Sequence, residues 1–518
     1  MKQNLSFRVL FMLMAMLFVG SKTYAQEPYA VLSDGGKTVT FYYDGNKVSR
    51  GGIDINTTWI DDNESSPYGS ATKAVIDASF VSYRPWYMWH WFEKCSLLTT
   101  IIGLENLKTD DVVYTDCMFK DCSSLTSLDV SSFNTRNLRS MNSMFSGCSS
   151  LTSLDLSHFN TEKVTDMGSL FYFCSSLTSL DVSSFKTDNV TDMVQMFFMC
   201  SSLTSLDVSK FNTEKVTDMM NMFSGCSSLT SLDVSNFNTA NVESLRGLFG
   251  RCKSLTSLDV SNFNTEKVTE IGAMFSGCSS LTSLDVSNFN TANVTYMGSM
   301  FSGCSSLTSL DVSNFNTENV THMSSMFSGC SSLTNLDVSS FKTDNVKYIY
   351  EMFRGCSSLT SLDVSGFKTD KVTELQYMFE GCSSLTNLDL SNFNTAKVTE
   401  MGAMFNGCSS LKTIYADEDK WSTINFYIPK TMFRDCTALV GGNGTMYDAN
   451  HTSQDYARID KPGQPGYFTR KVSTGIDQSK AQPVTDGGAW YTLDGRSMAG
   501  QPAVGGVYVK DGRKVVVK

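Results

Sequence analysis

Twelve cysteines recur at intervals of 26 residues, and this period constrains the fold more than any other feature of the sequence. They are Cys122, Cys148, Cys174, Cys200, Cys226, Cys252, Cys278, Cys304, Cys330, Cys356, Cys382 and Cys408. The residues around each cysteine repeat as well, as in MFSGCSSLTSLDVSNFNTENVTHM at 300–323. Periods of about 20 to 50 residues are typical of solenoids, propellers and arrays. We therefore expect a stack of similar coils rather than a globular domain built around one active site.

One repeat unit contains two apolar patterns with different spacings. In residues 154–156 the sequence Leu-Asp-Leu alternates as a short strand does, with the Asp facing outward. Further along, Met167, Leu170, Phe171 and Cys174 are spaced i, i+3, i+4 and i+7, which is the apolar stripe of a helix. In many copies Gly precedes the cysteine, a helix stop signal. The pattern predicts one short strand and one helix of about two turns per unit.

The units must stack in order to be stable. Burying the apolar side chains of one unit gains less free energy than ordering its backbone costs, so one unit does not fold alone. No proline occurs between Pro85 and Pro429, as an unbroken stack of parallel strands requires. Strands stack at about 4.8 Å whereas helices need about 10 Å, so strands on one side and helices on the other impose a curve. The strands are expected on the inside of that curve.

Residues 95–436 resemble the BspA-like leucine-rich repeats of bacterial surface proteins, because L-x-x-L-D-V-S-x-F and M-F-x-x-C recur together. The resemblance implies an α/β solenoid: a curved, right-handed leucine-rich-repeat array with a concave parallel sheet, short convex helices and small β caps at both ends. The chain departs from the commonest leucine-rich repeats, which place a buried Asn ladder where Phe133 and Phe159 stand here. We expect an invariant threonine, represented by Thr135, Thr161 and Thr187, to satisfy backbone groups at the turn instead.

The sequence predicts five segments. Residues 1–25 read as a secretory signal peptide, since Lys2 and Arg8 precede an apolar run at 9–19 that is shorter than the ~20 residues needed to span a bilayer. The others are an N-terminal β cap at 26–94, the solenoid at 95–436, a C-terminal cap and linker at 437–475, and a β tail at 476–518. No later apolar run is longer, so no transmembrane helix is expected.

Aspartate-glycine pairs predict hairpins near both ends of the chain. The N-terminal pairs are at 34–35 and 44–45, and the C-terminal pairs are at 494–495 and 511–512. Residues 490–518 resemble the C-terminal sorting domains of proteins exported by the type IX system of Bacteroidetes. That resemblance implies transport across the outer membrane, followed by display on the cell surface or release.

The cysteine ladder admits three interpretations: disulfides, metal ligands or packing. Zinc sites use closely spaced pairs such as C-x-x-C, which a single-file ladder does not provide. Disulfides between adjacent coils are sterically allowed but would make alternate coils differ. Because Cys174 lies on the apolar stripe of Met167 and Phe171, we expect buried, reduced thiols that pack as small hydrophobic groups. Cys95 and Cys117 are the expected exceptions, since Cys117 breaks the register.

One aspartate per unit forms a column on the predicted concave sheet. Flanking serines, of the Ser153 and Ser157 type, would hydrogen-bond the carboxylates and keep the sheet soluble. Alternatively, the column binds a basic partner or Ca²⁺, the one cofactor that the sequence leaves open. These candidate ligand-binding residues are Asp129, Asp155, Asp181, Asp207, Asp233, Asp259, Asp285, Asp311, Asp337, Asp363 and Asp389.

A second set of candidate binding residues departs from the repeat. Most lie on the predicted helix side, where copies differ most, and the remainder lie in RPWYMWHWFEKC at 84–95. In that segment the register predicts that Met88, Trp91 and Phe92 are buried, forming an aromatic lid on the first coil. The candidate surface anchors are Trp86, Trp89, Arg246, Arg251, Tyr350, Arg354 and Tyr377.

The sequence does not predict an enzyme. The four histidines stand in unrelated contexts, and we find no nucleophile elbow, phosphate loop or metal-ligand spacing. Removing the signal peptide lowers the formal charge by three, from −11 to −14, which disfavours nucleic acid and membrane surfaces as partners. Cationic patches or neutral glycans suit this acidic chain better. The BspA-like resemblance implies a surface-exposed or secreted adhesin for host extracellular-matrix proteins or other cells. The alternative is a spacer or coat protein without a specific ligand.

Overall fold

The computed structural model describes residues 25–55, 66–422 and 431–471, together with 490–492, 497–498, 502, 506–510 and 513–517. The chain divides after Thr469 into two compact units. Residues 1–24 of the predicted signal peptide lie outside the described residues. Within the described ranges, no helix is long and apolar enough to cross a membrane.

The regular elements lie mainly at the two ends of the first unit. Its strands are β1 Glu27–Ser33, β2 Thr38–Asp44, β3 Ile53–Asp54, β4 Lys73–Ile76, β5 Thr100–Ile102, β6 Asn387–Asp389, β7 Thr413–Ala416 and β8 Phe468–Arg470, the last of which ends one residue past the division. Its 3₁₀ helices are η1 Asp34–Gly36, η2 Ala78–Ser82, η3 Leu104–Asn106 and η4 Gln454–Tyr456. The strands form a five-stranded sheet, β3-β1-β2-β4-β5, and a three-stranded sheet, β6-β7-β8.

The five-stranded sheet continues into the first coil of the solenoid, because its edge strand β5 belongs to that coil. β1 and β2 pair antiparallel around η1, which confirms the hairpin predicted at Asp34. β2 ends at Asp44 as predicted, but β3 then pairs with β1 instead of β2. Phe41 of β2 stacks on Trp91 at 6.2 Å, so the cores of the sheet and the coils are continuous.

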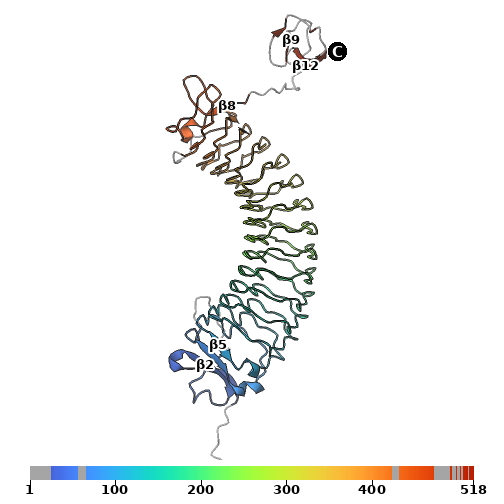
Figure 1. The fold of residues 1–518 in the computed structure, drawn as a ribbon, viewed down its shortest axis with the longest axis vertical. Helices are drawn as coiled ribbons and strands as arrows, with labels where there is room; N and C mark the ends of the chain where they lie inside the picture. The colour runs from blue at the N-terminus through green and yellow to red at the C-terminus, as the bar shows by residue number, and fades with distance from the viewer. Residues whose placement is uncertain are drawn as a thin grey trace, which may run out of the picture. The chain divides into compact units, whose positions relative to one another are not determined.

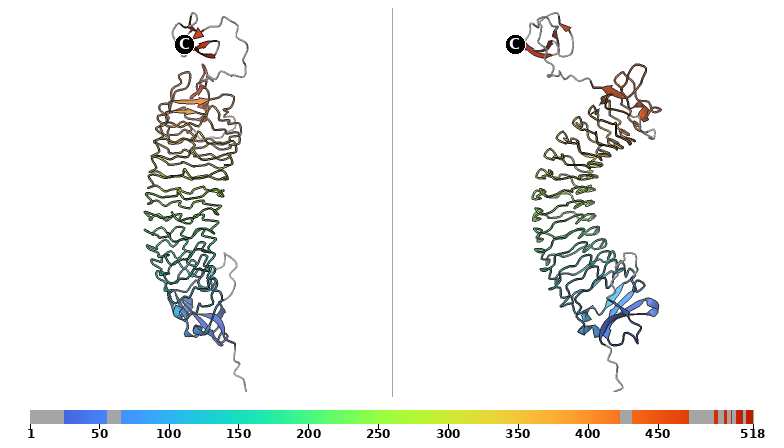
Figure 2. Two further views of the ribbon diagram at one scale, coloured as in Figure 1. Left: turned by 90° about the vertical axis from the view of Figure 1, so that its right-hand side faces the viewer. Right: turned by 180° about the vertical axis from the view of Figure 1, so that it is seen from behind.

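The coils stack in a curved row from residue 87 onward (Figures 1 and 2). One phenylalanine per coil, from Phe119 to Phe405, lies fully buried on the next, with ring centroids 5.6 to 5.9 Å apart. Methionine, leucine, valine and cysteine columns flank this stack and are buried as well. The predicted continuous apolar core is therefore present.

The predicted helices are wrong: the described residues contain no α-helix. In the segment that was expected to be helical, the Met167 N–H donates to Asp192 O of the next coil at 3.1 Å, and the Phe171 N–H donates to Met196 O at 2.9 Å. Between them, the Leu170 N–H donates to Met167 O, three residues back in its own coil. The segment is a run of turns, because a helix would hold neighbouring coils about 10 Å apart and the phenylalanine stack could not form.

The continuous ladder of parallel bridges lies in this same segment, not in the predicted Leu-Asp-Val strands. Those strands pair only near the ends of the stack, as β4 with β5 and β6 with β7. We call the ladder surface the ladder face and define it by its thirteen bridged positions: Tyr87, Tyr114, Ser140, Asp166, Asp192, Asp218, Ser244, Glu270, Tyr296, His322, Tyr348, Glu374 and Glu400. Backbone hydrogen bonds set the shortest possible separation between coils, so we infer that the ladder face lies on the inner side of the curve (Figure 1).

The threonine ladder is confirmed. The Thr213 hydroxyl donates to Asn238 O of the next coil at 2.9 Å and accepts from the Asn238 N–H at 2.7 Å. Each threonine thus satisfies backbone groups of the following coil. The equivalent threonines are all buried: Thr135, Thr161, Thr187, Thr239, Thr265, Thr291, Thr317, Thr343, Thr369 and Thr395.

The second unit contains a four-stranded antiparallel sheet in the order β10-β9-β11-β12. Its strands are β9 Trp490–Tyr491, β10 Ser497–Met498, β11 Gly506–Lys510 and β12 Arg513–Val517. β9 pairs with β10 and β11 pairs with β12, so the strands that flank both predicted Asp-Gly turns form hairpins.

Candidate binding surface

The repeated cysteines all point into the core, as predicted. All fifteen cysteines are free, and only Cys117 is not buried. The Cys304 thiol lies 3.1 Å from Phe275 O of the preceding coil and donates to it, and most of the column repeats this contact. Burial raises the pKa of the Cys278 thiol to about 12. The ladder thiols are therefore protonated, sheltered packing groups.

The aspartate column faces solvent, but it does not lie on the ladder face. The Asp207 carboxylate accepts from the Ser209 hydroxyl at 2.6 Å and from the Ser209 N–H at 3.0 Å, and these bonds lower its pKa. Hydrogen bonding by the serine two residues later is as predicted. The expected place of the column on a concave sheet is not, because the central Leu-Asp-Val segments do not pair as strands.

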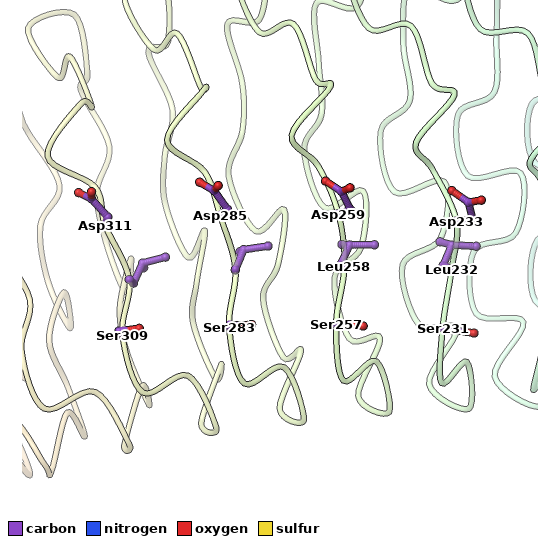
Figure 3. Close-up of a pocket in the computed structure, with 12 residues that line it drawn as sticks. Ser231, Leu232, Asp233, Ser257, Leu258, Asp259, Ser283, Asp285, Ser309 and Asp311 are labelled. Carbon is purple, nitrogen blue, oxygen red and sulfur yellow. The ribbon is translucent and has the colours of Figure 1, made fainter.

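A shallow cavity follows this column across four coils. Its volume is about 720 Å³, and it is lined by Ser231, Leu232, Asp233 and their equivalents in the next three coils. Figure 3 shows the labelled aspartates in a row, each pointing away from its own coil. The lining is the same in all four coils, so it gives a partner no means of selecting one position over another.

The ladder face, by contrast, changes character along its length. Asp166, Asp192 and Asp218 are bridged in succession, and burial raises the pKa of the last two. Each of the three carboxylates accepts from the backbone N–H two residues later, at 2.8 to 2.9 Å. This half-buried acidic run was not predicted, because the residue before the first Met of each unit was read as a helix position.

Aromatic side chains replace the acids further along the ladder face. Tyr296, His322 and Tyr348 stack with centroid separations of 5.3 and 4.4 Å. The guanidinium of Arg246 lies 5.2 Å from the Tyr296 ring centroid, which is cation–π distance. A Cβ at Gly272 would come within 2.1 Å of the Tyr296 ring, so only glycine at this position leaves room for the ring.

Exposed tryptophans lie at the other end of the ladder face. Trp86 is 57% exposed and Trp89 is 41% exposed, and both contact Tyr114 with centroid separations of 5.7 and 5.5 Å. Tyr87 lies between them and is 36% exposed. We call these four residues the tryptophan patch. In the same segment Met88, Trp91 and Phe92 are buried, as their register predicted.

The remaining candidate anchors differ in the contacts that they make within the chain. Arg354 pairs with Glu351 at 3.2 Å and Glu380 at 2.7 Å, and it lies 5.2 Å from the Tyr377 ring centroid. Tyr350 is partly buried.

Arg251 is exposed and has φ +59°, at a position where most coils have glycine.

Comparison with known protein families assigns the repeats to one of them. Four overlapping matches to a family described as "Mycoplasma protein of unknown function, DUF285" cover residues 87–204, 174–283, 244–362 and 349–457, which together exceed half of the chain. The chain belongs to the DUF285 family. A comparison of this DUF285 chain with curated proteins gives no match.

Several solved structures are similar to the DUF285 chain. A leucine-rich repeat protein from Eubacterium ventriosum is 16% identical, with 67% of this chain and 98% of that chain covered and a TM-score of 0.32. A leucine-rich cell surface protein from Faecalibacterium prausnitzii is 18% identical, with coverages of 81% and 93% and a TM-score of 0.29. The functional domain of InlJ from Listeria monocytogenes, which includes a cysteine ladder, is 21% identical, with coverages of 60% and 65% and a TM-score of 0.23.

Proposed function

We propose that this protein is an exported, surface-displayed binding protein that holds a partner on its ladder face, and that the partner is a protein or glycan of a host or another cell. In this proposal residues 1–25 direct export and the β tail acts as a type IX sorting domain. The end sheets cap a right-handed, BspA-like leucine-rich-repeat array. No catalytic role is proposed.

The observation that carries the proposal is the distribution of variable side chains. Binding energy concentrates in a few unlike aromatic and arginine side chains, not in uniform rows. The ladder face carries the tryptophan patch at one end and the stack of Tyr296, His322 and Tyr348 further along. The aspartate column repeats one residue, and its carboxylates already accept hydrogen bonds from their own chain.

The alternative is a spacer whose coils supply length without a specific ligand. The near identity of the central coils supports it, as does the chemistry of the exposed aspartates, which need no partner. The two proposals differ in one respect: a spacer tolerates any surface substitution that leaves the fold intact.

Replacing Trp86 and Trp89 together with alanine tests the proposal. The full chain is screened against immobilised matrix proteins and glycans, and any saturable binding is titrated. We expect the double variant to bind at least about 30-fold more weakly, as loss of an aromatic hot spot does. Neither tryptophan belongs to the buried core, so the fold and its thermal stability are expected to be unchanged.

The matched control replaces Asp207, Asp233 and Asp259 with asparagine. This variant is expected to bind within about threefold of the parent chain, because the column lies off the ladder face. Binding that is lost only in the asparagine variant would transfer the site to the aspartate column. Absence of saturable binding by the parent chain would favour the spacer.

A further inference from the structure

A cluster of chemically unlike side chains lies where the ladder face begins. His90 and Cys117 occupy the same position in two successive coils, because each lies three residues after a bridged tyrosine, Tyr87 and Tyr114 respectively. The His90 N–H donates to Asp116 O across these coils at 3.2 Å, which fixes the register. Glu93 and Lys120 form a second pair of stacked positions beside the first. In later coils the position of His90 is taken by residues such as Ser143 and Ser169.

Three of these side chains converge. His90 Nδ1 lies 2.5 Å from one carboxylate oxygen of Glu93, and Lys120 Nζ lies 3.1 Å from the other. One ligand atom each of His90, Glu93 and Cys117 can be chosen so that all three lie within 4.8 Å of one another. The side chains of His90 and Glu93 are 32% and 11% exposed, and Cys117 is partly exposed, so an ion can reach them from solvent.

We propose that His90 Nδ1, Glu93 Oε2 and Cys117 Sγ bind a divalent transition-metal ion of the Zn²⁺ class. An imidazole nitrogen, a thiolate and a carboxylate oxygen are the donors that zinc accepts, and three protein ligands leave a fourth tetrahedral position for water or a partner's donor. The sulfur and nitrogen donors favour Zn²⁺ over Ca²⁺ or Mg²⁺, which bind through oxygen. Lys120 remains on Oε1, where it orients the carboxylate and leaves Oε2 for the metal.

The site departs from the sequence-based expectation that the chain has no metal ligands. That expectation considered closely spaced cysteine pairs and the single-file cysteine ladder, whereas these donors are a histidine, a glutamate and a cysteine outside the ladder, from two coils. The inference does not depend on the proposed binding function. Because the other fourteen cysteines are buried, the reactivity of the native protein towards thiol reagents reports on Cys117 alone.

The test measures how fast iodoacetamide alkylates Cys117 in the reduced full chain, with and without added Zn²⁺. We expect stoichiometric Zn²⁺ to slow alkylation at least tenfold. Co²⁺ should give a thiolate charge-transfer band that saturates at one equivalent and disappears in Cys117→Ser. Replacing His90 with glutamine should abolish the protection, whereas replacing His158 with glutamine should not, because that histidine lies outside the cluster.

An alkylation rate that Zn²⁺ leaves unchanged would overturn the proposal. So would a cobalt band that persists in Cys117→Ser. Circular dichroism of each variant shows whether the fold is retained. His90→Gln keeps a polar side chain of similar size, so it separates loss of a ligand from loss of structure if Cys117→Ser is unstable.

Discussion

Raising the pH from 8 to about 10.5 is expected to unfold the solenoid. Burial raises the pKa of six core thiols, five in the ladder and one beyond it, from 9.0 to about 12: Cys148, Cys226, Cys278, Cys330, Cys382 and Cys436. Between these values the unfolded chain releases thiol protons that the folded chain retains, so stability is full below pH 9 and falls as the pH rises. The loss is about 1.4 kcal/mol per thiol for each pH unit above 9, or about 8 kcal/mol for the six at pH 10.

Circular dichroism and thiolate absorbance, recorded together in the presence of a reductant, check this expectation. Both should change in one cooperative transition, since the thiols ionise only when the coils open. A variant with Cys148, Cys226 and Cys278 replaced by alanine should show a shallower fall of unfolding free energy with pH. Thiols that titrate near pH 9 while the circular dichroism stays constant would show that they are not sheltered.

Replacing Thr213 with valine is expected to destabilise the protein by about 2 to 4 kcal/mol. Valine keeps the shape of threonine but removes the hydroxyl, which leaves the N–H and C=O of Asn238 without their partner. An unsatisfied buried polar group costs about 1 to 3 kcal/mol. Urea denaturation measures the loss.

Thr217→Val is the control within the same coil. The Thr217 side chain is exposed, and its single hydrogen bond to Thr191 O is long, at 3.4 Å. Its replacement should change stability by less than about 0.5 kcal/mol. Equal denaturation midpoints for Thr213→Val and the parent chain would refute the role of the threonine ladder.

The sequence predicted the packing of the coils better than their backbone. Period and polarity together identify the buried side, so the inward cysteines and the threonine ladder were predictable. The absence of helices was not predictable. The spacing of Met167, Leu170, Phe171 and Cys174 suits a helix, but it also suits successive turns that bring every third or fourth side chain into the core. The hydrogen bonds between coils and the separation of the stacked phenylalanines decide between the two structures.

The candidate sites were predictable to a smaller extent. The exposure of Trp86 and Trp89 followed from their register against buried Trp91. The acidic and aromatic runs of the ladder face could not be predicted in this way. The ladder lies in the segment after the predicted strand, so these residues were not expected to share one face. The cluster of His90, Glu93 and Cys117 arises from an offset of 27 residues between two coils, which a search for closely spaced ligands does not detect.

The central claim is that main-chain hydrogen bonds join the coils through the Met-x-x-Met-Phe segment. Amide hydrogen exchange measured by mass spectrometry tests it most directly. The N–H groups of Met297, Ser299 and Phe301 each donate to the next coil at 2.8 to 3.0 Å, so peptides covering 297–303 should exchange slowly.

Among the described residues, no backbone acceptor is found for the N–H groups of Leu310, Asp311 and Val312, so peptides covering 309–313 should exchange fast. Slow exchange at 309–313 together with fast exchange at 297–303 would contradict the account, because it would place the ladder in the Leu-Asp-Val segments.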